Sequence, residues 1–231
     1  MNSLFSKSHL FLFLFLVLFL NQNLKAQENV ELLIEPEFSI DLDTGTRWSH
    51  SFGIASRDII YEDDNFHFNA QHIELSHFTG YKVGDANKVS LGVRYRFKEI
   101  FHDSKTDELR IVEQFGHAVK HQDLKIGHRF RIEQRITELT RNRTRYRLSL
   151  EFPLKKMEQP QKTFFLKTST EALWMIGKKI HTVYEQRLSV SIGKEIGVNI
   201  ALDFGLQYRL SDYTHHPEHR IFLMTGLNLT I

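Results

Sequence analysis

Apolar and polar side chains alternate with a period of two along most of the chain after residue 28. The clearest stretch is 124–136, where apolar residues hold one set of alternate positions and mainly charged residues hold the other. Side chains of a β-strand point to opposite faces in turn, whereas a helix would spread the same residues around its circumference. The pattern recurs at 30–42, 89–98, 145–152 and 198–209. The chain is therefore predicted to be all-β.

Turn-forming residues separate the alternating stretches, most clearly at 43–45, 62–65 and 84–87. Eleven strand-like stretches result: 29–42, 46–61, 65–82, 87–98, 108–120, 123–137, 142–154, 163–176, 182–195, 197–210 and 219–231. Bacterial single-chain membrane barrels have even strand numbers. We therefore expect one antiparallel transmembrane barrel of 10 or 12 strands. A miscount is expected within 65–82, where the alternation breaks near His72 and Ile73 as a bulge would break it.

The first residues have the character of an export signal. Lys7 precedes the apolar run 10–20, and a polar segment then leads to Ala26. The run is much shorter than the roughly 20 apolar residues of a membrane-spanning helix. A short apolar core followed by a small residue is typical of a cleaved signal peptide. We predict a signal peptide at 1–26 and a barrel domain at 27–231, with a retained membrane anchor as the alternative.

Strand length and the position of aromatic residues favour a membrane barrel over a soluble one. The predicted strands run about 12–15 residues, whereas strands of soluble proteins cluster near 5–6. Aromatic residues occur towards strand ends, where the two interfaces of a membrane would hold them. Trp48, Tyr61, Tyr81, Tyr95, Phe97, Tyr146, Phe152, Trp174, Tyr184 and Tyr208 are placed in this way. Aromatic residues are also common in ordinary sheets, which is the alternative explanation.

The last predicted strand ends at the C-terminus with a recognisable pattern. Residues 225–231 resemble the signal that the outer-membrane insertion machinery reads, with Gly226, Leu229 and Ile231 at the key positions. The final residue of that signal is usually aromatic, and here it is isoleucine. This segment predicts transient contact with the insertion machinery.

Composition excludes several kinds of chemistry. The chain has no cysteine, so disulfides, thiolate metal ligands and cysteine nucleophiles are excluded. Its formal net charge is +2, which gives no reason to expect a nucleic-acid partner. The segment with His215, His216 and His219 could hold a metal weakly, but the chain has no HExxH, GxSxG or calcium-loop motif. We predict no catalytic residue, no cofactor and no specific metal site.

Four short motifs carry a resemblance to a known family. They are 108–114 (ELRIVEQ), 128–135 (HRFRIEQR), 143–147 (RTRYR) leading into 152–154 (FPL), and 184–187 (YEQR). With them, residues 28–231 resemble the family known as domain of unknown function 2490, predicted outer-membrane barrels found chiefly in Bacteroidota. The resemblance implies a barrel fold and an outer-membrane location. It implies no activity and transfers no catalytic residue.

The polar faces of the strands would line the interior if the apolar faces meet lipid. Arginines then stand on neighbouring strands, and like charges side by side repel. The cationic residues are Arg129, Arg131, Arg135, Arg143, Arg145 and Arg147, and the candidate compensating residues are Glu113, Glu133, Glu151 and Glu185, together with Glu171 and the row Glu31, Glu35, Glu37 and Asp41. Two interpretations stay open. The lumen is either filled by ion pairs, or it binds anions, centred on Arg129, Arg131, Arg145 and Arg147.

The sequence thus predicts a monomeric outer-membrane β-barrel of a Gram-negative bacterium, either structural or a narrow channel with a charged lumen. Its partners would be outer-membrane lipid and, in the channel hypothesis, a small anionic solute. One alternative is a membrane-embedded enzyme that processes lipids or peptides. A second alternative is a soluble periplasmic barrel that binds an apolar ligand.

Overall fold

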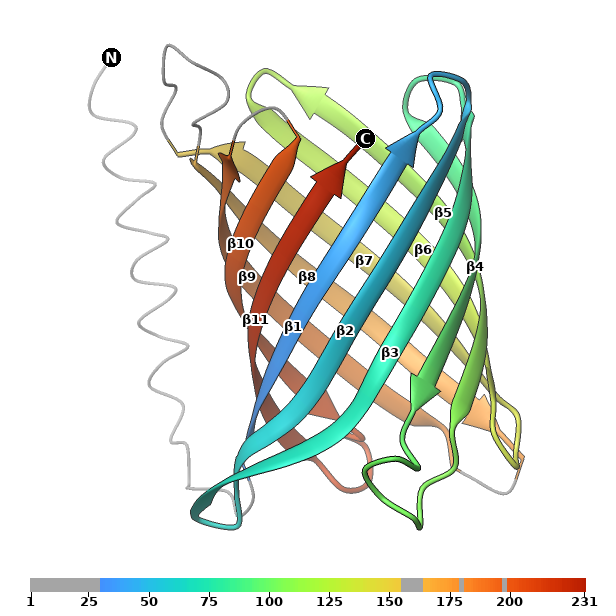
Figure 1. Cartoon of the computed structure of the whole chain (residues 1–231), viewed down its shortest axis with the longest axis vertical. Helices are drawn as coiled ribbons and strands as arrows, with labels where there is room; N and C mark the ends of the chain where they lie inside the picture. Colours follow the sequence, from blue (N-terminus) through green and yellow to red (C-terminus); the bar gives the residue numbers. More distant parts are fainter. Residues whose placement is uncertain (1–29, 155–163, 179–180, 197–198) are drawn as a thin grey trace.

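The chain forms a closed β-barrel in a computed structural model that describes residues 30–154, 164–178, 181–196 and 199–231 (Figure 1). The predicted signal peptide, 1–26, lies outside these residues. The described part of the chain contains no helix long and apolar enough to cross a membrane.

Eleven strands make up the barrel in the described residues, and each strand is hydrogen-bonded to its neighbours in the sequence. The strands are β1 (Val30–Asp43), β2 (Trp48–Glu62), β3 (Asn65–Val83), β4 (Asn87–Phe97), β5 (Glu108–His121), β6 (Leu124–Ile136), β7 (Arg141–Pro153), β8 (Phe164–Gly177), β9 (Val183–Ile196), β10 (Ile200–Ser211) and β11 (Glu218–Thr230). These bounds lie within three residues of the predicted ones. The all-β barrel is therefore confirmed.

The predicted strand number of 10 or 12 is wrong, and the eleven counted stretches were all strands. An odd number is possible because β1 and β11 pair in parallel, from Val30 beside His219 to Asp41 beside Thr230. A parallel ladder satisfies the backbone groups of both strands and leaves no open edge. The chain end joins this seam, since the amide of Ile231 donates to the carbonyl of Asp41 at 2.8 Å.

Local backbone features agree with the predicted turns and bulge. Asp63 and Asp64 connect β2 to β3 with φ values of 51° and 60°, the positive angles that a two-residue hairpin of type I′ needs. The register between β2 and β3 shifts at two points, and one of them lies beside His72, where Arg57 faces His72 and Asp58 faces Ala70. The break in alternation beside His72 is thus a bulge, as expected.

The barrel is apolar outside and polar inside. Among the described residues, the buried side chains are mostly charged or polar, while large hydrophobic side chains such as Leu91, Leu188 and Phe204 are more than half exposed. One apolar cluster lies inside, formed by Leu33, Ile59 and Phe222 on β1, β2 and β11.

The two ends of the barrel carry different connections. The odd-numbered strands, β11 included, end at one rim, here called the C-terminal rim. The even-numbered strands end at the opposite rim, where β1 begins (Figure 1).

Candidate functional site

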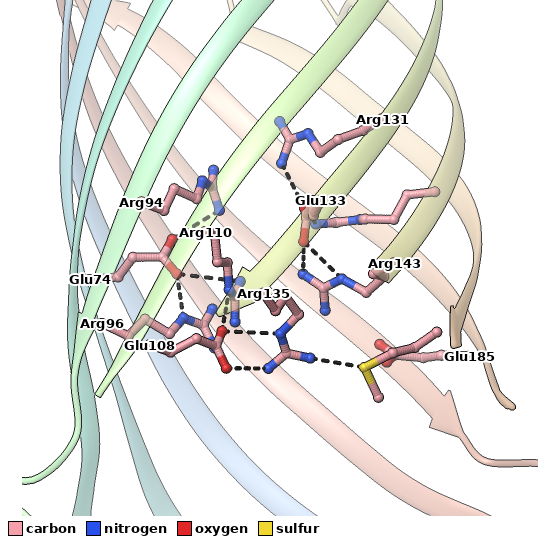
Figure 2. A network of polar contacts seen from close by, with 12 residues as sticks. Glu74, Arg94, Arg96, Glu108, Arg110, Arg131, Glu133, Arg135, Arg143 and Glu185 are labelled. Atoms are coloured by element: carbon pink, nitrogen blue, oxygen red, sulfur yellow. Dashed lines mark hydrogen bonds and ion pairs between the residues drawn. The ribbon is translucent and has the colours of Figure 1, made fainter. Parts of the chain in front are cut away.

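Arginine and glutamate side chains of β3 to β9 converge inside the barrel, as Figure 2 shows for part of the set. They do so because alternate positions of each strand face the lumen, and these positions carry charged residues. Four carboxylates organise the cluster: Glu74, Glu108, Glu133 and Glu171.

Glu74 on β3 collects three arginines from the next two strands. One carboxylate oxygen accepts a hydrogen bond from Nη1 of Arg94 at 2.9 Å. The other accepts from Nε of Arg96 and lies 3.6 Å from Nη1 of Arg110 (Figure 2). The Glu74 carboxylate therefore joins β3 to β4 and β5 across the lumen wall.

Glu108 on β5 binds cations from three strands or their ends. It accepts two hydrogen bonds from Arg135 on β6, at 3.1 and 2.8 Å (Figure 2). Arg110, two residues further along β5, donates through Nε, and Lys98 donates at 3.1 Å. Because Arg110 contacts both Glu74 and Glu108, the two groups form one network.

Glu133 on β6 is fully enclosed and paired with arginines of its own strand and of β7. Nε of Arg143 donates to Oε2 at 2.8 Å, and Nη1 of Arg145 donates to Oε1 at 2.8 Å. Arg131 approaches within 3.5 Å (Figure 2). This carboxylate has no access to water of its own, so its charge is stabilised by the arginines.

Glu171 on β8 has the largest number of cationic neighbours. Arg145 and Arg147 donate to it through Nε at 2.8 and 2.6 Å, and Arg129 through Nη2 at 3.0 Å. Arg187 on β9 lies 3.7 Å away. Arg145 thereby connects Glu171 to Glu133.

Positive charge exceeds negative charge in this network. Within the described residues, eleven Arg and Lys side chains share the four carboxylates, and Glu185 adds a fifth beside Arg187. Nε of Arg94 and Nη2 of Arg110 are buried and donate to no acceptor of the described chain. Because buried donors and charges are costly when unpaired, this lumen favours anionic groups.

The network lies between two cavities. The cavity towards the C-terminal rim has a volume of about 750 Å³, and the one towards the opposite rim about 560 Å³. Arg57, His72 and Arg96 line both. The ion pairs thus divide the lumen into two vestibules.

Charges are segregated across the larger vestibule. Arg129 and Arg147 are each about a quarter exposed to it, on β6 and β7. Glu37 on β1 and Asp203 on β10 line the far wall, and within the described residues no cation lies within 4 Å of either carboxylate. In the closed ring of strands, β1 lies five places from both β6 and β7. A basic wall therefore faces an acidic wall.

The structure brings together nine of the ten residues predicted for the lumen. Seven are in the network described above: Arg129, Arg131, Glu133, Arg135, Arg143, Arg145 and Arg147. Glu151 also faces the larger vestibule, 3.7 Å from Lys125, and Glu185 pairs with Arg187.

Glu113 is the exception, and its predicted lumenal position is wrong. Its side chain is exposed, and its cross-strand partners Leu91 and Ile132 belong to the outer apolar face. On β5 the inward positions are those of Glu108 and Arg110, and residue 113 has the other parity.

The three residues of the predicted insertion signal lie on the seam strand or directly after it. Gly226 faces the larger vestibule, where an added Cβ would lie 2.5 Å from Oδ1 of Asp203. Leu229 is paired with Ile40 and Ile200, and Ile231 is exposed. Their role in insertion stays a prediction.

Several network residues were not among the predicted ones, namely Glu74, Arg94, Arg96, Lys98, Glu108, Arg110 and Arg187. Arg94 and Arg96 belong to the polar face of a predicted strand, so the sequence already showed on which side of the sheet they lie. Glu74 follows the bulge in β3, which hid its parity. Which of these residues lie close together on neighbouring strands of the barrel follows only from the strand register, which the sequence does not give.

These features define a closed β-barrel with a charged lumen divided by ion pairs. The chain belongs to the family described as protein of unknown function DUF2490, whose profile matches residues 23–220. Among curated proteins, none matches the chain in sequence.

Proposed function

We propose that the protein is a non-enzymatic outer-membrane β-barrel that takes small anionic solutes into the larger vestibule. The observation that carries the proposal is the surplus of arginine over carboxylate in an enclosed lumen, with Arg129 and Arg147 partly open to the cavity.

The outer surface supports the membrane location. Its exposed side chains include Leu188, Val190 and Ile192 on one strand, which would be costly in water as part of a continuous apolar band. Ring pairs occur near both ends of the barrel: Trp48 with Tyr81 at one end and Tyr95 with Phe97 at the other. Aromatic girdles at both interfaces are typical of outer-membrane barrels.

The guanidinium groups support an anionic ligand. A guanidinium fork matches the geometry of carboxylate and phosphate oxygens and stays charged at any ordinary pH. Arg129 and Arg147 both contact the same oxygen of Glu171, so they retain donors for a further acceptor. The facing acidic wall would orient a solute that carries both charges.

The polar lumen disagrees with the alternative of a soluble barrel that holds an apolar ligand. Such a barrel needs a mainly apolar interior. Among the described residues, the buried hydrophobic side chains are only those of the cluster Leu33, Ile59 and Phe222, together with Val112 and Leu173, while the other buried side chains are polar or charged. An apolar ligand would bury the network's charges without pairing them.

Two measurements test the proposal. The membrane location predicts that the mature protein needs detergent to stay dissolved and shows heat-modifiable gel mobility; a protein that stays dissolved without detergent would overturn it. Anion uptake predicts that inorganic pyrophosphate binds to the folded barrel in a calorimeter.

The matched variants place the binding in the vestibule. Replacing Arg129 and Arg147 by Gln should weaken pyrophosphate binding by about tenfold or more, because each charge-assisted contact contributes about 1.5–3 kcal/mol. Arg220→Gln removes a charge beside Glu31 near the opposite rim and should leave binding unchanged. Equal affinity in all three proteins, or no binding by the parent protein, would contradict the anion proposal.

A further inference from the structure

Two loops of the opposite rim bring two histidines and one aspartate together. His181 precedes β9, while Asp212 and His215 lie in the β10–β11 connection. Their ligand atoms all lie within 4.8 Å of one another. Nε2 of His181 is 2.9 Å from Oδ2 of Asp212, and Nδ1 of His215 is 3.5 Å from Oδ1.

The Asp212 carboxylate is the centre of this group. Its side chain is only 13% exposed, although both histidines are about half exposed. Oδ1 is buried and accepts no hydrogen bond from the described residues. An ordinary ion pair would need only one imidazole. Here Oδ2 faces His181 and Oδ1 faces His215, so each carboxylate oxygen has its own imidazole nitrogen.

The backbone holds the three side chains in this arrangement. The amide of His215 donates to the carbonyl of Asp212 at 3.0 Å, which closes a turn and sets the spacing of these two residues. The rings of His181 and His215 approach from separate loops, with centroids 4.3 Å apart. An imidazole ring nitrogen that carries no proton offers a lone pair to a metal.

We propose that His181, Asp212 and His215 form a binding site for a divalent transition metal of the Zn²⁺ class. Two imidazoles and a carboxylate are the ligand set of many three-ligand zinc sites, which leave a fourth position open to water or to a ligand. The nitrogen ligands disfavour Ca²⁺ and Mg²⁺, which prefer an all-oxygen set.

Small movements of the side chains would complete the coordination. Metal–ligand distances near 2.0–2.1 Å place tetrahedral ligands about 3.4 Å apart. The His181–Asp212 separation already approaches this value, and the remaining adjustment falls on exposed imidazoles. Nδ1 of His215 now contacts the Thr214 hydroxyl at 2.9 Å, and this contact would be exchanged for the metal.

Metal binding would tie the β8–β9 and β10–β11 connections together at the opposite rim. The site lies away from the anion vestibule at the C-terminal rim, so it does not depend on the function proposed above.

The test uses the full barrel in detergent, prepared without a histidine tag and stripped with a chelator. Titration with Zn²⁺ in a calorimeter should give one site per chain, and Co²⁺ should give the visible absorption of a four-coordinate complex. His181→Ala and His215→Ala should each weaken Zn²⁺ binding at least tenfold, as even loss of an outer-shell partner costs 10–100-fold. His216→Ala, on the same loop but outside the cluster, is the matched control and should bind like the parent.

Heat-modifiable mobility of each variant shows that the barrel is folded, so weakened binding cannot be attributed to unfolding. Equal Zn²⁺ affinity in the parent, His181→Ala and His215→Ala, or no binding by the folded parent, would overturn the proposal. An equal loss in His216→Ala would also overturn it.

Discussion

Arg145 on β7 donates to Glu133 on β6 at 2.8 Å, across two neighbouring strands, and the Glu133 side chain is fully enclosed. The same guanidinium also binds Glu171 on β8. One arginine therefore joins three strands through two buried carboxylates. Removing any member should destabilise the barrel, because the charges left behind are almost completely buried and lose a partner.

Glu133→Gln should lower the free energy of unfolding by about 3–5 kcal/mol, the usual cost of removing one partner of a buried ion pair. The change leaves Arg131, Arg143 and Arg145 around a neutral amide. Urea unfolding of the barrel in lipid vesicles, followed by tryptophan fluorescence, measures the effect. Glu138→Gln, in the exposed β6–β7 connection, is the control. A loss below about 1 kcal/mol, the level of a surface pair, would show that the network contributes little to stability.

The parallel seam can be tested with a disulfide, because the chain has no cysteine of its own. Ser39 and Asn228 are partners in the β1–β11 register, and the Asn228 amide donates to the Ser39 hydroxyl at 2.9 Å. Cysteines at both positions should form a bridge, since paired strands bring Cα atoms within disulfide range. Mobility on a non-reducing gel measures it.

Cysteines at Ser39 and Thr225 serve as the control, because Thr225 pairs with Pro36 and faces the other side of the sheet. These should not bridge. A barrel closed by a further strand between β1 and β11 would give no bridge in either variant, which would contradict the eleven-strand closure.

Glu113→Leu should stabilise the barrel in lipid. Glu113 lies on the outer face between Leu91 and Ile132, where a carboxylate has to leave water if the band is in a bilayer. Arginine or lysine costs about 2–4 kcal/mol at the centre of such a face, and an acid costs less. A gain of about 1–2 kcal/mol is expected in vesicles. No gain, or a loss, would argue against lipid contact at this position.

Acid should loosen the β4–β5 loop through Asp107. Its carboxylate accepts the backbone amides of Lys98 at 2.7 Å and Glu99 at 3.1 Å, and these hydrogen bonds lower the pKa of Asp107 below its ordinary value. A group with a lowered folded-state pKa stabilises its loop above the ordinary pKa, and this contribution is lost as pH falls through the folded value.

Hydrogen exchange at the Lys98 and Glu99 amides should therefore show less protection at strongly acidic pH than at neutral pH, after correction for the intrinsic rates. Asp107→Asn should lose this pH dependence. Unchanged behaviour in that variant would assign the effect to another group.

The sequence was sufficient to predict the strands but not the closure. Alternation placed all eleven stretches, because each strand has an apolar face and a polar face that differ strongly in polarity. The expected even number came from other barrels. It failed because the pairing of Val30 with His219 joins residues nearly 190 positions apart, and no local pattern records such a contact.

For most residues of the candidate site, the sequence predicted which face of the strand each side chain is on, but it did not predict which residues pair with one another. The rows around Arg131 and Arg145 were visible from their parity. Which carboxylate each arginine pairs with depends on the register between the strands, and this register places Glu171 beside Arg145 and Arg147. The prediction for Glu113 was wrong because its charge was taken as evidence of a lumenal position. Glu113 lies three residues after Arg110 on the same strand, so the two side chains point to opposite faces, and that of Arg110 points inward. The rim cluster was missed since His181 and Asp212 meet only through their loops.

Because β1 and β11 run side by side in the same direction, the start of β1 and the end of β11 would lie on opposite sides of a membrane that the barrel crossed. The start of β1 and the end of β11 lie at opposite rims (Figure 1). In a bilayer, an epitope fused before Val30 would be reached by antibodies from one side, and an epitope fused after Ile231 only from the other. If the barrel is inserted into a membrane, either the start of β1 or the end of β11 therefore has to cross the bilayer during assembly.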